Sequence, residues 1–333
     1  MEEWVARIGT DGLYALIVLA AALAALAVMA VRRRRYGLKP GTTAVFGILA
    51  VLLGFLFGRL GYCLVSLSYV MGRDWAYFNQ MNLNACMFYG AAAGVGLAGW
   101  LTGLLMKEKP AAVLDAAAAP AALLTAVGRF AETLIERGYG ESIEDWFDPM
   151  MERSMIALED TEALCRWPFA YELGFYQDWR FSIFLWEAVG ALVIFGILLG
   201  MKKRRDGAAA VLFLLLYAGM QTTFESMRRD DMLCWSFVKV SQLLSGILVL
   251  LLAVLCWARL PAEQRKPAAL IRAAALVLVC CGVIMAMEFA LEQKILFLMW
   301  MRADVCYALM AAASLGLIFS VLPLWRRGYP ETA

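Results

Sequence analysis

The chain contains no histidine among its 333 residues. Metal sites that need histidine ligands and general bases built on imidazole are therefore excluded. Charged residues are also scarce, at 17% of the chain, and its eight cysteines include no pair with the C-x-x-C spacing of zinc and redox sites. We expect the protein to use no metal and no cofactor.

Apolar residues are abundant instead. They make up 63% of the chain, the mean hydropathy is +0.70, and uncharged runs of about 18 residues or more recur. The first run starts near Leu13 and ends in Arg32–Arg35, as a spanning helix with a stop-transfer flank does, and no lipidation signal or cleavable signal peptide is evident. This pattern predicts an all-α polytopic membrane protein in contact with the bilayer, and it gives no reason to expect a nucleic-acid partner.

The apolar runs predict nine transmembrane helices, a core of seven followed by a C-terminal pair. They cover residues 13–31, 41–66, 84–106, 111–134, 182–200, 207–225, 237–258, 268–290 and 303–325. We expect a transmembrane core over residues 1–260 and an additional helix pair over residues 261–333.

Basic residues occur in every second loop between these segments. The basic loops are Arg32–Lys39, Lys107–Lys109, Lys202–Arg205, Arg259–Lys266 and Arg326–Arg327. Because cytoplasmic loops carry an excess of lysine and arginine, these loops are expected in the cytoplasm. The N-terminus is then outside the cell and the C-terminus inside.

One long hydrophilic stretch, residues 135–180, falls outside on this topology. It is rich in acidic and aromatic residues, too long for a simple turn and too aromatic for a disordered linker. We expect a small extracytoplasmic cap with aromatic rings at headgroup level, although an acidic linker is the alternative. Cys165 and Cys234 fall on this side and can either pair or remain free.

The fourth segment carries an arginine and a carboxylate into the membrane. Arg129 and Glu132 are three residues apart, so they share one face of a helix and can contact each other. An ionisable residue inside a membrane is expected either to pair with another polar group or to serve a function. Two interpretations stay open, an internal ion pair or an anion-binding Arg129 that faces a wet cavity reached by lipid.

Polar residues from five consecutive segments share one depth, that of the outer leaflet. They are Arg59, Tyr89, Arg129, Glu132, Glu187, Gln221, Glu225 and Arg228. Burying each against lipid costs several kcal/mol, on the order of 3, unless it pairs or reaches water. This predicts a shared polar cavity, in which two or three arginines would suit a phosphate group because guanidinium donates to phosphate in a bidentate fork.

Several of these residues stand in motifs similar to those of a known family, in the same order and with similar spacing. Phe57-Gly58-Arg59-Leu60-Gly61-Tyr62 resembles G-x-R-x-G-Y, Leu185-Trp186-Glu187 resembles L-Y-E, and the stretch from Gly128-Arg129 to Gly140 resembles G-R-I-G-N-F-I-N-G-E-x-x-G. The stretch from Tyr217 to Arg228 resembles Y-G-x-x-R-F-x-x-E-x-x-R. The family is that of the prolipoprotein diacylglyceryl transferases of bacterial inner membranes, and the resemblance covers about residues 10–258.

The resemblance implies transfer of a diacylglyceryl group from phosphatidylglycerol, an anionic phospholipid, to the thiol of a lipobox cysteine in a prolipoprotein, with release of glycerol phosphate. It also implies a location in the bacterial plasma membrane. Catalytic roles are expected for Arg129, Glu132 and Tyr89. Lipid contacts are expected from Arg59, Tyr62, Gly140, Glu187, Gln221, Glu225 and Arg228.

Four positions depart from the family pattern. Tyr89 stands where the family has histidine, and Gln221 stands where it has its second arginine. Glu132 and Ile135 stand where the family signature has asparagines. The reaction needs an acceptor for the thiol proton, and Glu132 is a better base than Tyr89, although pairing with Arg129 would weaken it. Three hypotheses therefore stay open: an active or altered transferase, a non-catalytic relative that binds anionic lipid or lipoprotein precursors, and an unrelated transporter.

Overall fold

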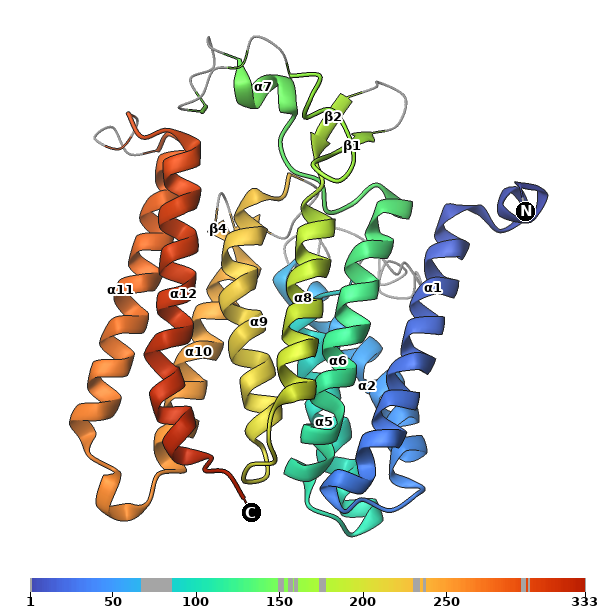
Figure 1. Cartoon of the computed structure of the whole chain (residues 1–333), viewed down its shortest axis with the longest axis vertical. Coiled ribbons are helices and arrows are strands. Elements are labelled where there is room, and N and C mark those ends of the chain that lie inside the picture. The colour runs from blue at the N-terminus through green and yellow to red at the C-terminus, as the bar shows by residue number, and fades with distance from the viewer. Residues whose placement is uncertain are drawn as a thin grey trace.

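The computed structural model describes residues 2–66, 86–148, 153–154, 158, 161–173, 178–229, 234–235, 238–294, 298 and 300–332. In these ranges nine helices are long and apolar enough to span a bilayer, as predicted. They are α1 (Glu2–Arg32), α2 (Thr42–Val65), α5 (Phe88–Met106), α6 (Pro110–Ala131), α8 (Ile183–Gly200), α9 (Ala208–Met227), α10 (Val240–Ala258), α11 (Pro267–Leu291) and α12 (Ala303–Gly328). The helices run side by side as one bundle (Figure 1). The all-α polytopic class is confirmed.

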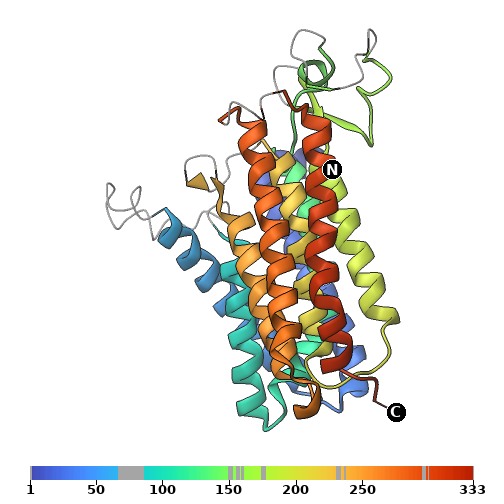
Figure 2. The same cartoon turned by 90° about the vertical axis from the view of Figure 1, so that its left-hand side faces the viewer.

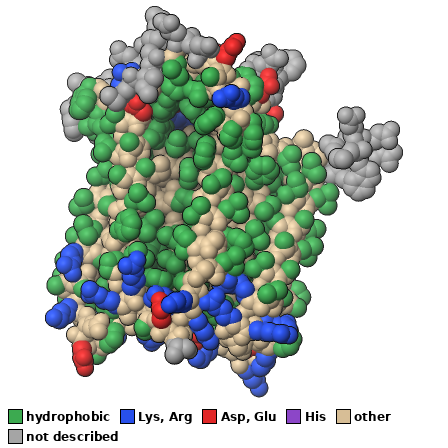
Figure 3. Space-filling view, viewed as in Figure 1, with side chains coloured by type: hydrophobic (Ala, Val, Ile, Leu, Met, Phe, Trp, Pro, Cys, Tyr) green, Lys and Arg blue, Asp and Glu red, His purple; other side chains and the backbone are tan. Residues whose placement is uncertain are grey.

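The two ends of the bundle differ in charge. A wide apolar surface covers the middle of the molecule, and lysine and arginine side chains gather at the end where the C-terminus lies (Figures 1 and 3). The opposite end carries the short helix α7 (Ile143–Phe147) and the antiparallel strands β1 (Ala170–Leu173) and β2 (Asp178–Phe181). A view turned by 90° shows these elements beyond the ends of the spanning helices (Figure 2). The described part of the predicted cap therefore lies at the end away from the basic loops.

Glycine allows α2 and α5 to approach closely. A Cβ on Gly94 would overlap the backbone of Leu53, 2.6 Å from its carbonyl carbon, and one on Gly90 would overlap the carbonyl of Phe57. Inside a bilayer the hydrophobic effect does not drive helices together, so helix association depends on small residues that let the backbones pack closely. The Gly90–Gly96 cluster is therefore a packing surface.

Replacing Gly94 with alanine is expected to separate α2 from α5, because a backbone carbonyl cannot move aside as a flexible side chain can. Overpacking of this kind costs about 1–3 kcal/mol. Thermal unfolding of the protein in detergent should show a lower midpoint for Gly94→Ala. Gly196→Ala is the control, since a Cβ there meets nothing within 4 Å. Equal midpoints for the two variants would contradict the close approach.

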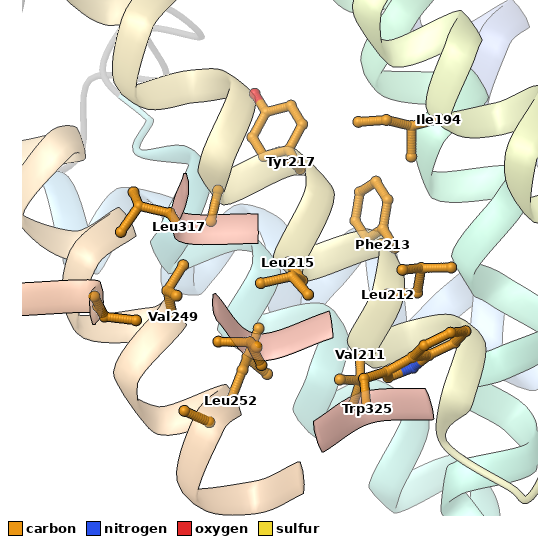
Figure 4. Close-up of a cluster of buried hydrophobic side chains, with 14 of the residues drawn as sticks. Ile194, Val211, Leu212, Phe213, Leu215, Tyr217, Val249, Leu252, Leu317 and Trp325 are labelled. Carbon is orange, nitrogen blue, oxygen red and sulfur yellow. The ribbon is translucent and has the colours of Figure 1, made fainter. Parts of the chain in front are cut away.

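Helix α9 lies at the centre of the bundle. In its most apolar window 67% of the residues are buried, more than in the other spanning helices. Its side chains Val211, Phe213 and Leu215 pack among residues of α8, α10 and α12, as Figure 4 shows. Since α9 also carries Gln221, Glu225 and Arg228, its position fixes much of the polar site.

Charged side chains from other elements cap both ends of α9. Asp115 of α6 accepts hydrogen bonds from the backbone N–H groups of Gly207, Ala209 and Ala210 at 2.7–3.0 Å. At the other end the Lys239 ammonium donates to the carbonyl oxygens of Glu225, Ser226 and Arg228 at 2.5–3.1 Å. A carboxylate at the N-terminus and an ammonium at the C-terminus satisfy unpaired backbone groups and oppose the helix dipole.

The C-terminal pair, α11 and α12, packs directly on this centre. Gln242 of α10 donates to Glu288 of α11 at 2.6 Å, and the indole N–H of Trp325 donates to the carbonyl oxygen of Ala208 at 2.9 Å. Buried residues of both helices belong to the same hydrophobic core as α9 and α10.

The suggested pairing of Cys165 with Cys234 is not formed, because all eight cysteines are free. Cys165 lies in a turn of the cap segment, where its N–H bonds to the carbonyl oxygen of Thr161. Cys234 lies in a short strand, β3 (Cys234–Trp235), that pairs with β4 (Val238–Lys239). The two residues thus belong to separate local structures.

Candidate functional site

Four charged side chains from three helices form a closed ring of ion pairs. Arg129 stands in the last turn of α6, and Glu132 begins the 3-10 turn that follows it. Arg129 Nη1 lies 2.7 Å from Glu132 Oε1, and Glu132 Oε2 lies 3.0 Å from Arg228 Nη2. Glu187 Oε2, on α8, closes the ring at 3.0 Å from Arg228 Nη1 and 3.5 Å from Arg129 Nε. We call these four residues the ionic ring.

Each member of the ionic ring is held by more than one partner. The Arg129 guanidinium also donates to the hydroxyl of Tyr217 at 3.0 Å, so all three of its nitrogens are engaged. Removing one member would unbalance the buried charge, but each of its neighbours would keep one partner of opposite charge. Because two positive and two negative groups alternate, the ionic ring has no net charge.

A second polar pair lies next to the ionic ring on α9. The Gln221 amide donates to Glu225 Oε2 at 2.5 Å and to Glu187 Oε1 at 3.3 Å. Both residues are almost completely buried. Gln221 thus connects Glu225 to the ring without bringing a positive charge.

A cavity of about 560 Å³ borders the ionic ring. Its polar lining consists of Tyr14, Tyr62, Cys86, Thr125, Arg129, Glu132, Arg137, Glu225, Arg228 and Ser241. The remaining wall is mostly apolar and comes from α1, α5, α6 and α9. Along α6 it extends from Leu114 to Arg129, a distance of about 22 Å at 1.5 Å per residue. The cavity therefore joins guanidinium groups at one end to a long apolar wall.

The structure confirms the ion pair of Arg129, and anion binding by Arg129 stays a prediction. It forms the predicted ion pair with Glu132, and it lines the cavity. Glu187 and Gln221 are not among the cavity-lining residues, and they act on the site through Arg129, Arg228 and Glu225.

The structure places Tyr89 away from the cavity lining. Its hydroxyl forms a hydrogen bond with Ser245 Oγ of α10, and its ring meets that of Phe88 edge to face. Gly140 is a packing position: its N–H donates to the carbonyl oxygen of Phe181 at 2.8 Å, and a Cβ there would lie 3.0 Å from Ile183. Gly140 therefore holds the cap segment against the start of α8.

Of the two candidate residues on α2, Tyr62 lines the cavity and Arg59 does not. The Arg59 guanidinium lies 5.9 Å from the centre of the Tyr62 ring. Cys86, also in the lining, precedes α5 outside the spanning helices. Burial raises the pKa of its thiol, an effect that nearby Arg59 opposes. We therefore expect Cys86 to be a neutral thiol at pH 7.

Sequence reasoning missed several residues of the site, among them Tyr14, Tyr217 and Lys239. Tyr14 lines the cavity from α1, Tyr217 holds Arg129, and Lys239 fixes the end of α9 that carries Arg228. Tyr217 stands in a motif that resembles one of the family's, so the resemblance could have identified it. Tyr14 lies in an apolar run with no such signal, and the role of Lys239 depends on where α9 ends in space.

Comparison with known proteins agrees with this geometry. A model of the prolipoprotein diacylglyceryl transferase family matches residues 9–258, three quarters of the chain. The chain belongs to this family. It is therefore a multi-pass bacterial membrane protein, and α11 and α12 lie beyond the matched residues.

Two relatives are similar to this chain over most of their length. One, from Symbiobacterium thermophilum, is 26% identical over 245 residues, which cover 69% of this chain and 82% of that protein. Another, from Staphylococcus haemolyticus, is 24% identical over 220 residues, which cover 63% of this chain and 71% of that protein. Both are named phosphatidylglycerol–prolipoprotein diacylglyceryl transferases.

Proposed function

We propose that the protein transfers the diacylglyceryl group of phosphatidylglycerol to the thiol of a lipobox cysteine in a prolipoprotein. The observation that carries this proposal is the cavity, in which Arg129 and Arg228 stand at one end of an apolar wall about 22 Å long. A phospholipid has the same division, since its phosphate lies at one end and its acyl chains extend from the other. The phosphate would lie at the ionic ring and the chains along α5 and α6.

The two arginines supply the charge that the reaction needs. The thiolate sulfur attacks the glycerol carbon that bears the phosphate, a new S–C bond forms, and the C–O bond to the phosphate breaks. Glycerol phosphate leaves with the electron pair of that bond. Each guanidinium has five N–H donors, so Arg129 retains donors for phosphate beyond those that hold the ring.

One observation favours the alternative of a non-catalytic relative that binds anionic lipid or lipoprotein precursors. Glu132 and Glu187 already neutralise both arginines of the ionic ring, and Gln221 adds no charge. A lipid phosphate at Arg129 would therefore meet a guanidinium whose charge Glu132 already balances. Such a site could hold a lipid without stabilising a leaving phosphate.

A transfer assay separates these two functions. The purified full-length protein is incubated in liposomes with phosphatidylglycerol labelled in its acyl chains and a synthetic lipobox peptide. We expect label on the peptide, and none on a peptide with serine in place of cysteine. Binding of the lipid without transfer would contradict the transferase function and favour the non-catalytic relative. Absence of both lipid binding and transfer would contradict both functions.

The orientation is proposed from the distribution of charge. Lysine and arginine gather at one end of the bundle, and the ionic ring lies toward the other end, where α6 and α9 terminate. The positive-inside rule then puts the ionic ring at outer-leaflet depth, the C-terminus in the cytoplasm and the N-terminus outside.

Labelling of introduced cysteines tests this orientation. In a protein with Cys165 and Cys234 replaced by serine, Ala163→Cys in the cap should react with an impermeant maleimide added to intact cells. Lys202→Cys should react only after the membrane is opened. Both wild-type side chains are exposed in the structure, so a difference in labelling reports the side of the membrane on which each residue lies. The reverse pattern would place the ring at the cytoplasmic leaflet and contradict the proposal.

A further inference from the structure

Three carboxylates gather at the polar end of the cavity, and their partners differ. Glu132 lies within ion-pair distance of Arg129 and Arg228. Glu187 contacts the same two arginines. If either carboxylate accepted a proton, it would lose the charge that holds two buried guanidinium groups.

Glu225 has a different environment. Its side chain is 1% exposed and lines the cavity, and it accepts a 2.5 Å hydrogen bond from the neutral Gln221 amide. In the described part of the chain, no lysine or arginine nitrogen lies within 4.0 Å of its carboxylate oxygens. Gln221 stands one helical turn before Glu225 at the position where the family motif has arginine. The substitution therefore leaves Glu225 without the cation that this spacing would supply.

Other titratable groups surround Glu225 without forming an ion pair to it. Groups within electrostatic range include Glu187, Tyr217, Tyr89, Lys239 and Cys234. Lys239 is the one cation of these five, and its ammonium donates to backbone carbonyl oxygens, including that of Glu225. The Glu225 carboxylate can thus take up a proton without breaking an ion pair.

We propose that Glu225 is the group that accepts the proton of the attacking thiol, a role that rests on the proposed transferase function. Tyr89 stands at the position of the family's histidine, but its hydroxyl is directed to Ser245 and lies outside the cavity lining. Glu132 lines the cavity but is bound by two arginines. Glu225 is the lining carboxylate whose protonation leaves the ionic ring intact.

The step balances with the groups present. The thiol proton moves to Glu225 as the sulfur attacks the glycerol carbon, so the S–C bond forms and the C–O bond to phosphate breaks. Glycerol phosphate departs with one additional negative charge, held by Arg129 and Arg228. Glu225 then returns its proton to the released phosphate or to water.

The test is the pH profile of Glu225→Gln, which keeps the shape of the side chain but cannot accept the proton. General bases contribute about 10²–10⁴-fold, so transfer to the lipobox peptide at pH 7 should fall by about 100-fold or more. The difference in transfer rate between the wild type and Glu225→Gln should shrink as the pH rises past about 8.5, because a free thiol then ionises without a base. Retention of phosphatidylglycerol by the variant shows that the site is still formed.

Glu288→Gln is the matched control. Glu288 is also buried and also accepts from a glutamine amide, that of Gln242 at 2.6 Å, but it does not line the cavity. Its replacement should leave both the rate and the pH profile unchanged. Should Glu225→Gln fail to fold, Glu225→Asp supplies the second test, because it keeps a carboxylate and should keep the pH profile of the wild type.

The outcomes separate this proposal from the proposed function. If the wild-type protein transfers and Glu225→Gln transfers at an equal rate, or is slower by the same factor at every pH, Glu225 is not the proton acceptor while the transferase stands. A Glu225→Asp protein that binds lipid but transfers only as the pH rises past about 8.5 would also overturn the role, because the thiol would then ionise without help from the carboxylate. A wild-type protein that transfers nothing would overturn both proposals.

Discussion

An Arg129→Gln protein should fold but lose at least about 100-fold in diacylglyceryl transfer, because it lacks the guanidinium expected to bind the phosphate. Loss of one preorganised charge-stabilising group costs enzymes about 10²–10³-fold. The fold should survive because Glu132 and Glu187, the carboxylates that Arg129 would strand, both keep Arg228 as a partner. Transfer and bound phosphatidylglycerol are measured on the same purified sample.

The control for this prediction is Arg229→Gln. Arg229 is partly buried and lies 3.6 Å from Glu141, but it does not line the cavity. The same change there should leave lipid binding and transfer close to those of the wild type. Retention of phosphatidylglycerol by a folded Arg129→Gln protein would show that Arg129 is only a structural partner of the carboxylates.

Replacing Lys239 with methionine should strongly destabilise the protein. The ammonium donates to three carbonyl oxygens, and methionine leaves them buried without a donor. Hydrogen bonds to a charged group contribute about 1.5–3 kcal/mol each, and the losses are not additive, so we expect about 3 kcal/mol in the free energy of unfolding. Arg228 follows the end of α9 directly, so lipid binding should weaken as well.

Lys202→Met provides the comparison. Lys202 is exposed at the basic end of the bundle, where its ammonium lies 3.8 Å from Glu331, and exposed pairs contribute little. Thermal unfolding should separate the two variants by several degrees, with Lys239→Met the lower. Midpoints that coincide would contradict the cap on α9.

The sequence predicted the spanning helices, since these follow from local patterns. Apolar runs and basic loops located all nine spans. The spacing of Arg129 and Glu132 predicted their contact, because three residues along a helix return to nearly the same face. These inferences need no knowledge of how the helices pack.

The arrangement of the site depends on packing and was not predictable in this way. Glu187 and Arg228 were expected at the same depth, but nothing in the sequence shows that both arginines share both carboxylates. Tyr89 was assigned a catalytic role by resemblance, and the orientation of its hydroxyl toward Ser245 follows from how α5 meets α10. That role remains a prediction, as do the roles of the other site residues.

Filling the cavity with a large side chain and measuring the bound lipid tests most directly whether the phospholipid binds there. Ala92 lines the cavity from α5, whereas its neighbour Ala93 is exposed on the outer surface of the same helix. Ala92→Trp and Ala93→Trp thus make the same change inside and outside the cavity, and native mass spectrometry counts the phosphatidylglycerol retained by each. We expect Ala93→Trp to bind lipid as the wild type does, and Ala92→Trp to bind no lipid and to transfer nothing. Full lipid occupancy and transfer in a folded Ala92→Trp protein would show that the phospholipid lies elsewhere.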